Sequence, residues 1–248
     1  PRFIFCSTQA VILEDRDVLD GDESLAYPDT FTDHYARSKA EAEQLVLKEH
    51  AGATVLRPPW VWGAGDTNNL PTLLRPSLND RIAYFAGGKN QLETVHALNF
   101  VLGAQACAAS EQTKGKIYFV TDESPVLSGD FSNAILEACG LKPNKRSLPA
   151  AVGRALAWSG KRDNKGNLIL PRSSFLYMVR HQVLSDETFR LDTGYTSSVS
   201  RAAGLKDLES WANFVGGPRE IAVGRRRGAS RSLVDLTWDF LMNESNLL

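Results

Sequence analysis

A tyrosine and a lysine four residues apart carry the clearest chemical signal in the sequence. Tyr35 and Lys39 lie in the run Tyr-Ala-Arg-Ser-Lys, and residues at this spacing share one face of an α-helix. A free phenol has a pKa of about 10 and is a poor base at neutral pH. A fixed positive charge beside a phenol favours the phenolate form. The pair therefore indicates a side chain that can take up and return a proton.

Two hydroxyl residues, Ser7 and Thr8, precede this pair along the chain. A hydroxyl beside the phenol can hold an alcohol or carbonyl oxygen while the proton moves, and the three groups together suit proton transfer coupled to hydride transfer. Tyr and Lys at this spacing are also common on amphipathic helices. A half-buried Tyr35 with a solvated Lys39 is therefore the alternative interpretation of the pair.

The surrounding sequence predicts elements that would position these side chains. The apolar run Pro1 to Thr8 is typical of a short buried strand that ends in hydroxyl residues. Tyr35 to Glu49 predicts a helix, with Asp33 as its N-cap. Thr54 to Gly63 predicts a second strand that continues into a Pro-broken loop.

At this point the sequence resembles the extended short-chain dehydrogenase/reductases of the NAD-dependent epimerase/dehydratase superfamily. The likeness is strongest to the branch of 3β-hydroxysteroid and sterol-4-carboxylate dehydrogenases. The likeness covers roughly residues 1 to 160, and its matching stretches occur in the family's order: F-I-F-C-S-T, Y-A-R-S-K-A-E-A-E, L-R-P-P-W-V-W-G-A-G-D, T-V-H-A-L-N and I-Y-F-V-T-D. Five ordered motifs are much more specific than any one of them.

The resemblance implies a role for each matching residue. Thr8 would be the catalytic hydroxyl, Tyr35 the general base in oxidation and general acid in reduction, and Lys39 the group that stabilises the phenolate and binds the nicotinamide ribose. Pro58 and Val61 would flank the nicotinamide ring. NAD is the family's commoner cofactor, and NADP stays open because the residue that selects between them has no counterpart in this sequence.

The same resemblance implies an α/β fold: the C-terminal part of a Rossmann-like doubly wound parallel sheet with a smaller substrate-binding lobe. Residues 1–123 would belong to the NAD(P)-binding domain and residues 124–215 to the substrate-binding lobe. Residues 216–248 depart from the family, and their composition indicates an Arg-rich basic tail with a terminal helix at Leu233 to Leu241. The substrate would be a small hydrophobic alcohol or ketone, with a 3β-hydroxysteroid or sterol as the first expectation.

A glycine-rich turn is missing from the sequence. A dinucleotide site on this fold uses such a turn, between the first strand and the first helix, to hold the pyrophosphate. None of the 19 glycines forms G-x-G-x-x-G, and the partial match at Gly63 and Gly65 has Asn68 at the third position. We therefore expect the chain to be the C-terminal part of the family's fold, without the adenosine half of the cofactor site.

The composition is typical of a globular protein, and it gives no sign of a nucleic-acid-binding or membrane-spanning one. With 248 residues and 43% hydrophobic content the chain can bury a sizeable core. A net charge of -1 gives no reason to expect nucleic acid as a partner. No apolar run is long enough for a membrane span. Three widely spaced cysteines are expected to be reduced core thiols in a cytoplasmic protein: Cys6, Cys107 and Cys139. A homo-oligomer is left open.

Three local expectations can be compared with the structure. The acidic segment Val11 to Thr32 is expected to be a solvated loop near the mouth of the site. Asn99 is expected to cap the helix that follows it. Phe131 to Cys139 is expected to be a helix that ends at Gly140.

Three other functions remain open from the sequence. A nucleotide-sugar epimerase or dehydratase shares the Ser/Thr, Tyr and Lys residues, and a flavonoid- or aldehyde-type reductase is a further enzyme class. A catalytically inactive fragment that serves only as a binding module is the alternative outside enzymes.

The missing glycine-rich turn leads to a first prediction. We expect these 248 residues alone to show no saturable binding of NAD(H) or NADP(H) at millimolar concentrations, and to purify as an oligomer or aggregate. Calorimetric titration with both cofactors, beside size-exclusion chromatography, measures both. Micromolar binding to a monomer would contradict the expectation.

Overall fold

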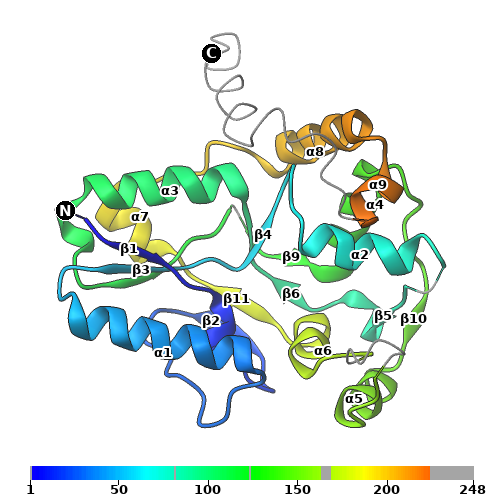
Figure 1. Ribbon diagram of the computed structural model, residues 1–248, viewed down its shortest axis with the longest axis horizontal. Helices are drawn as coiled ribbons and strands as arrows, with labels where there is room; N and C mark the ends of the chain where they lie inside the picture. Colours follow the sequence, from blue (N-terminus) through cyan, green and yellow to red (C-terminus); the bar gives the residue numbers. More distant parts are fainter. Residues whose placement is uncertain (1, 81, 123, 163–168, 224–248) are drawn as a thin grey trace.

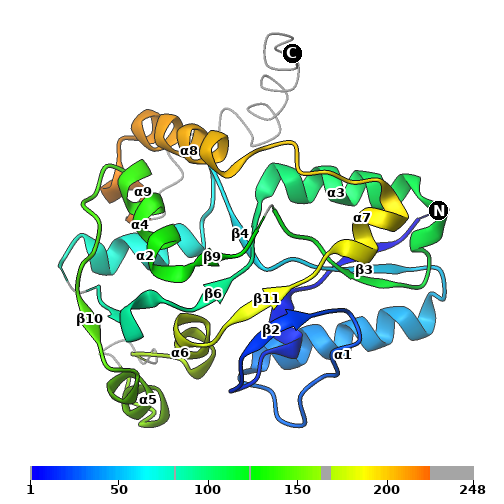
Figure 2. The same ribbon diagram turned by 180° about the vertical axis from the view of Figure 1, so that it is seen from behind.

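The computed structural model describes residues 2–80, 82–122, 124–162 and 169–223. Most of the predicted basic tail, including the expected terminal helix at Leu233 to Leu241, lies outside these residues. The described chain forms two lobes joined by a mixed sheet (Figures 1 and 2). The predicted α/β class with parallel strands is confirmed.

The first lobe is built on a three-stranded parallel sheet in the order β1-β3-β8. Its strands are β1 (Ile4–Cys6), β3 (Thr54–Arg57) and β8 (Ile117–Phe119). Helix α1 (His34–Glu49) lies on one side of this sheet, and α3 (Ala97–Ala109) and α7 (Glu187–Thr193) lie on the other (Figures 1 and 2). All four residues of β3 are buried, as expected of a central parallel strand.

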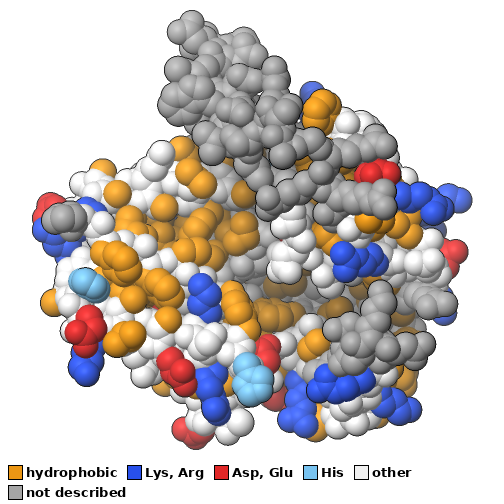
Figure 3. Space-filling view, in the orientation of Figure 1, with side chains coloured by type: hydrophobic (Ala, Val, Ile, Leu, Met, Phe, Trp, Pro, Cys, Tyr) orange, Lys and Arg blue, Asp and Glu red, His pale blue; other side chains and the backbone are white. Residues whose placement is uncertain are grey.

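Strand β1 lies at the edge of the three strands that the structure describes in this sheet. Phe3, next to it, is 45% exposed, and Val101 on α3 is also exposed. Figure 3 shows apolar side chains gathered on the face of the molecule that carries α3 and β1. This part of the lobe therefore leaves apolar side chains exposed.

The second lobe is mainly helical. Its larger core surrounds the buried indole of Trp62 and is formed by α2 (Asn69–Ser77), α4 (Ser128–Ala138), α8 (Arg201–Val215) and α9 (Pro218–Val223). A smaller core lies beneath α5 (Ala150–Trp158) and α6 (Arg172–Val179). The two-residue strands β5 (Tyr84–Phe85) and β10 (Ser147–Leu148) pair beside it, and the 3₁₀ turn η2 (Ala86–Gly88) follows β5.

A four-stranded sheet in the order β2-β11-β6-β9 connects the lobes. It contains β2 (Val18–Gly21), β11 (Gln182–Leu184), β6 (Gln91–Leu92) and β9 (Val126–Leu127). A separate parallel pair joins β4 (Trp60–Trp62) to β7 (Thr94–His96). Two short 3₁₀ helices complete the described elements, η1 (Gln9–Ile12) and η3 (Glu111–Thr113).

Several local predictions are confirmed. Asp33 caps α1 by accepting a hydrogen bond from the amide of Ala36 at 2.8 Å. Helix α4 ends near Gly140, whose φ of 79° is the left-handed conformation that glycine adopts easily. The division of the chain into residues 1–123, 124–215 and 216–248 stays a prediction.

Other local predictions are wrong. The segment expected as a solvated loop is one only in part: its aspartates are exposed, but it also contains β2 and the end of η1, and its apolar residues Val11, Ile12 and Leu13 are buried. Cys6 is exposed, because it belongs to the edge strand β1, whereas the other two thiols are buried.

The cap of α3 also differs from the prediction. His96 caps this helix by accepting a hydrogen bond from the amide of Leu98. Asn99 lies within the first turn of the helix. Its side-chain amide is not a cap but donates to the buried Asp122 carboxylate at 2.8 Å and to the carbonyl of Val199 at 2.9 Å.

Asp122, just beyond β8, ties the two lobes together at the end of the sheet. Its buried carboxylate accepts hydrogen bonds from four groups: the Trp62 indole, the Thr94 hydroxyl, the His96 amide and the Asn99 side chain. These contacts fix β4, β7 and the start of α3 relative to β8. No helix within the described residues is long and apolar enough to cross a membrane.

Candidate active site

The segments that carry the candidate residues Thr8, Lys39 and Pro58 lie side by side where β1 and β3 end, at the carboxyl edge of the parallel sheet. The backbone ladder continues beyond the strands, because the Ser7 amide donates to the Leu56 carbonyl at 2.8 Å and the Gln9 amide donates to the Pro58 carbonyl at 3.0 Å. Thr8, between these two amides, therefore lies beside Pro58. In open α/β sheets this edge is where ligands bind.

Thr8 is held by a local hydrogen bond. It is the N-cap of η1, and its half-buried hydroxyl oxygen accepts from the Ala10 amide at 3.2 Å. A hydroxyl has one proton to donate besides its acceptor lone pairs. The cap therefore fixes the side chain of Thr8 while its proton stays available to a ligand.

Tyr35 and Lys39 lie on the first turns of α1, as the spacing predicts. Tyr35 is 54% exposed. The ammonium of Lys39 donates to the carbonyl of Cys6 at 2.9 Å and lies 5.1 Å from the centre of the Phe5 ring. Cys6 is the last residue of β1, two residues before Thr8. The face of α1 that carries the candidate pair is therefore bound directly to the strand that leads into the candidate hydroxyl.

A stripe of small residues allows α1 to approach η1 closely. Ala36 and Ala40 are fully buried, one turn apart, and Ala40 packs with Val11 and Ile12 of η1. Tyr35 and Lys39 border this stripe on the helix surface. Larger residues in place of the two alanines would push the helix, and the candidate pair with it, away from η1 and Thr8.

A buried ion pair fixes the rotation of α1 on the sheet. Glu43, one turn beyond Lys39, has no exposed surface and accepts from Arg57 at the end of β3. The Arg57 Nη2 atom lies 2.7 Å from Glu43 Oε2 and its Nε lies 3.0 Å from Oε1. Such a two-point contact between guanidinium and carboxylate allows little change of orientation.

Tyr27 completes this buried pair. Its hydroxyl donates to Glu43 Oε2 at 2.7 Å, and the Arg57 guanidinium lies over its ring at 5.3 Å. Burial, followed by the bond to the Glu43 carboxylate and that group's charge, raises the pKa of Tyr27 to about 12. Tyr27 therefore stays a neutral donor to Glu43 throughout the physiological pH range.

Pro58 and Val61 belong to the segment between β3 and the end of β4. The Pro58 carbonyl accepts from the Gln9 amide, and the Val61 carbonyl accepts from the Asn69 side chain at 3.0 Å. The structure thus brings Pro58 next to Thr8, whereas Val61 pairs with Val95 of β7. Their role toward a nicotinamide ring stays a prediction.

Tyr177, on α6 of the second lobe, lies close to the same residues. Burial raises the pKa of its hydroxyl, the neighbouring Gln9 side chain opposes that rise, and electrostatic interactions with Asp33 and Tyr35 add to it. Sequence reasoning did not identify Tyr177, because the contact depends on how α6 folds back on η1. Glu43 was missed too, although a glutamate one turn beyond Lys39 and in line with Ala36 and Ala40 is a usable signal.

The described residues offer polar groups that suit the nicotinamide-ribose half of a dinucleotide. The Ser7 hydroxyl is buried at the carboxyl end of β1 and has no partner among the described residues, and the Lys39 ammonium lies on the adjoining helix. A ribose hydroxyl is a suitable partner for both groups. The pyrophosphate half has no glycine-rich turn in this sequence to receive it. Within the described residues, no three His, Cys, Asp or Glu side chains cluster as metal ligands would.

Comparison with known proteins identifies the family of this chain. The model of the 3-beta hydroxysteroid dehydrogenase/isomerase family matches residues 1–150, which include every candidate residue predicted from the sequence. The chain belongs to this family. Membership confirms the resemblance inferred from the five ordered motifs.

Two relatives illustrate the range of this family. The chain is 34% identical to a 4-hydroxy-2-methyl-3-oxo-4-farnesyl-3,4-dihydroquinoline-1-oxide ketoreductase of Stigmatella aurantiaca, over 84% of this chain and 64% of the relative. It is 30% identical to a 3 beta-hydroxysteroid dehydrogenase/Delta 5-->4-isomerase of Mycobacterium tuberculosis, over 63% of this chain and 44% of the relative. The chain thus spans less than two thirds of the length of either relative.

Solved structures support the fold. The UDP-glucuronic acid 4-epimerase of Bacillus cereus, solved in complex with NAD, superposes with a TM-score of 0.61 over 86% of this chain and 61% of its own. Its sequence is only 16% identical, so the likeness establishes the Rossmann-type fold alone.

The buried ion pair leads to a stability prediction. Replacing Glu43 by Gln leaves the Arg57 guanidinium buried without a counter-charge, which costs roughly 3–5 kcal/mol of unfolding free energy. Chemical denaturation followed by circular dichroism measures the loss.

Glu41→Gln is the matched control, because Glu41 is exposed on the same helix and surface changes stay within about 0.5 kcal/mol. The double variant Glu43→Leu/Arg57→Met is expected to lose less than Glu43→Gln, since it leaves no unpaired charge. Equal losses for Glu43→Gln and Glu41→Gln would contradict the assignment.

Proposed function

We propose that this chain forms the catalytic part of an NAD(P)-dependent oxidoreductase that interconverts a secondary alcohol and a ketone. Thr8, Tyr35 and Lys39 would carry the reaction. The observation that supports this most strongly is the bond from the Lys39 ammonium to the Cys6 carbonyl, which ties the Tyr35 face of α1 to the strand end leading into Thr8. The alternative of a solvated Lys39 without a fixed position disagrees with that contact.

Each side chain would have one task. Thr8 would donate its free hydroxyl proton to the substrate oxygen and fix its position. Tyr35 would accept the proton of the alcohol during oxidation and return it during reduction. Lys39 would place a positive charge one helical turn away, which favours the phenolate during the transfer. NAD(P), when bound, accepts or supplies the hydride.

A hydrophobic substrate fits the second lobe and the family. Four large apolar side chains on α5, α6 and β10 are exposed in the described structure: Leu148, Val152, Trp158 and Met178. The names of the two relatives above refer to a farnesylated quinoline oxide and a 3β-hydroxysteroid, which both carry a large hydrocarbon part. We propose a 3β-hydroxysteroid, or a sterol-like alcohol or ketone, as the substrate class.

A nucleotide-sugar epimerase or dehydratase is the second candidate function. The likeness to a UDP-glucuronic acid 4-epimerase favours it at the level of fold only. A sugar diphosphate requires positive charge and amide donors, whereas the exposed apolar surface of the second lobe suits a steroid better.

The proposed role of Tyr35 leads to a catalytic prediction. In the full-length product of the gene, Tyr35→Phe removes the proton-exchanging hydroxyl and keeps the ring. General acid–base groups contribute about 10²- to 10⁴-fold, so kcat should fall by at least the lower figure. Steady-state turnover followed by NADH absorbance measures it.

Tyr84→Phe is the control for the loss of a phenolic hydroxyl elsewhere. Tyr84 lies on β5 and bonds Asn133 at 2.7 Å, so its variant should keep near-normal turnover. Near-normal turnover of Tyr35→Phe, Thr8→Ala and Lys39→Met together would show that the catalytic assignment is wrong.

The substrate class has its own test. A panel of hydroxysteroids, small phenolic ketones and UDP-sugars, assayed at equal concentrations with NAD(H) and NADP(H), compares the candidate functions directly. We expect the highest kcat/KM for the hydroxysteroids. Preference for the UDP-sugars would replace the steroid proposal by the epimerase one, and absence of turnover with every compound would favour a binding module.

A further inference from the structure

The segment that follows Thr8 is attached to the second lobe at several points. The Gln9 side chain lies close enough to Tyr177 of α6 to lower the pKa of its hydroxyl. Leu13 is fully buried in the small core with Phe175 and Leu176 of the same helix. The next attachment, at Asp15, is polar and lies nearer the surface. Helix α6 therefore packs on the short segment that directly follows Thr8, the residue with the candidate catalytic hydroxyl.

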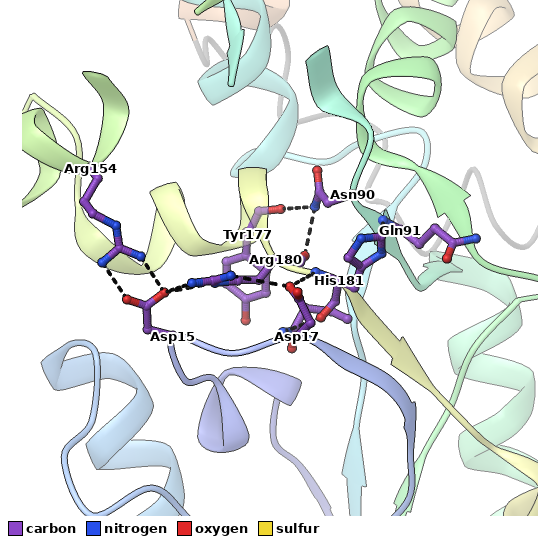
Figure 4. A network of polar contacts seen from close by, with 9 residues as sticks. Asp15, Asp17, Asn90, Gln91, Arg154, Tyr177, Arg180 and His181 are labelled. Atoms are coloured by element: carbon purple, nitrogen blue, oxygen red, sulfur yellow. Dashed lines mark hydrogen bonds and ion pairs between the residues drawn. The ribbon is translucent and has the colours of Figure 1, made fainter. Parts of the chain in front are cut away.

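Asp15 binds two arginines, one on α5 and one directly after α6 (Figure 4). Arg154 of α5 donates to both carboxylate oxygens, at 2.7 and 2.9 Å. Arg180, directly after α6, donates twice to Oδ1, at 2.9 and 2.7 Å. The hydrogen bonds from Arg154 are the main cause that lowers the pKa of the Asp15 carboxyl, so it is ionised at neutral pH. One carboxylate thus joins α5, α6 and the segment after Thr8.

The carboxyl end of α6 is held by two further groups (Figure 4). The Asp17 carboxylate accepts from the amide of His181 at 3.0 Å. The buried side chain of Asn90 donates to the carbonyls of Tyr177 and Arg180, at 2.8 and 3.0 Å. Tyr177 lies between these attachments, and its side chain points from α6 toward the segment after β1 (Figure 4).

We propose that Asp15 is a positioning residue: by holding Arg154 and Arg180 it keeps α6 docked on the segment after Thr8, with Tyr177 beside Tyr35, and so sets the affinity of the site for its alcohol or ketone. This inference rests on the function proposed above. It adds a residue that does not touch the reacting atoms and that acts through α6.

The strength of these ion pairs suits positioning better than folding. Asp15 keeps 35% of its side-chain surface exposed, and Arg154 keeps 44%. Exposed pairs contribute little stability and weaken in salt. The buried contacts of Leu13 and Asn90 hold α6 in the fold without Asp15. Loss of the Asp15 charge should therefore loosen the end of α6 while the lobe stays folded.

The kinetic test uses Asp15→Asn in the full-length product of the gene, with the best substrate from the panel above. Asn keeps the size but lacks the charge and one acceptor oxygen. We expect KM for the alcohol or ketone to rise about three- to tenfold, with kcat within about twofold because Tyr35, Lys39 and Thr8 are untouched. KM for NAD(H) should not change.

Two variants make this test specific. Asp20→Asn removes an equal charge from an exposed position on β2, where the Asp20 side chain has no hydrogen bond or ion pair with any described residue, and should leave KM unchanged. Asp15→Glu keeps the charge and should restore most of the affinity. At high salt, KM of the wild type should approach that of Asp15→Asn, and KM of Asp15→Asn should change less. An unchanged KM in Asp15→Asn, or a fall confined to kcat, would overturn the proposal.

Hydrogen exchange separates this inference from the proposed function, because it needs no turnover. Asp15→Asn should speed amide exchange in residues 172–181 and leave residues 34–49 of α1 unchanged, whereas Asp20→Asn should change neither. Unchanged exchange in residues 172–181 would overturn the proposal whether or not the protein turns over a substrate. Faster exchange there, in a protein inactive toward every alcohol and ketone, would refute the proposed function and the effect on affinity, and would support only the docking of α6.

Discussion

The buried pair between Glu43 and Arg57 is the contact on which the geometry of the candidate site depends. Arg57 ends β3, the central strand of the three-stranded sheet, and Glu43 lies on α1 two turns beyond Tyr35. The pair thus joins the helix that carries the candidate acid–base group to the strand that leads into Pro58. A rotation of α1 would break two charged hydrogen bonds inside the protein, so Tyr35 and Lys39 face one direction only.

The physical cost of this pair explains why it specifies geometry more than it adds stability. Both side chains are almost completely removed from water, and their attraction offsets that desolvation only with good geometry and additional hydrogen bonds. Tyr27 supplies one such bond. Any rotation of α1 that misaligns Glu43 and Arg57 therefore costs free energy. A proton-transfer site requires such a fixed orientation of its side chains. The ion pairs of Asp15 with Arg154 and Arg180 differ, because these charges are partly exposed. Loss of these pairs is expected to leave the lobe folded.

Local sequence patterns predicted the elements that carry the candidate residues. The apolar run before Thr8 forms β1, and Asp33 caps α1 where the spacing of Tyr35 and Lys39 predicts a helix. These features depend on neighbours within a few residues, for which the preferences of caps and periodicity apply. The family of the chain was also predictable, because its motifs are contiguous.

Tertiary contacts were the part that the sequence did not predict. Asn99 resembles an N-cap by type, yet Asp122 and Val199 draw it into the protein interior. The acidic segment after Thr8 resembles a solvated loop, yet Leu13 is buried beneath α6, and Asp15 binds arginines from α5 and from the residue after α6. In each case the deciding partner lies far along the chain, where local propensity and charge pattern carry no information.

A crystal structure of the full-length gene product with NAD and a bound ketone would test the central claim most directly. We predict that the ketone oxygen lies within hydrogen-bonding distance, about 2.6–3.2 Å, of both the Tyr35 and the Thr8 hydroxyls, with the Lys39 ammonium on the nicotinamide ribose. A ketone oxygen held by other groups, with Tyr35 facing solvent, would contradict the account.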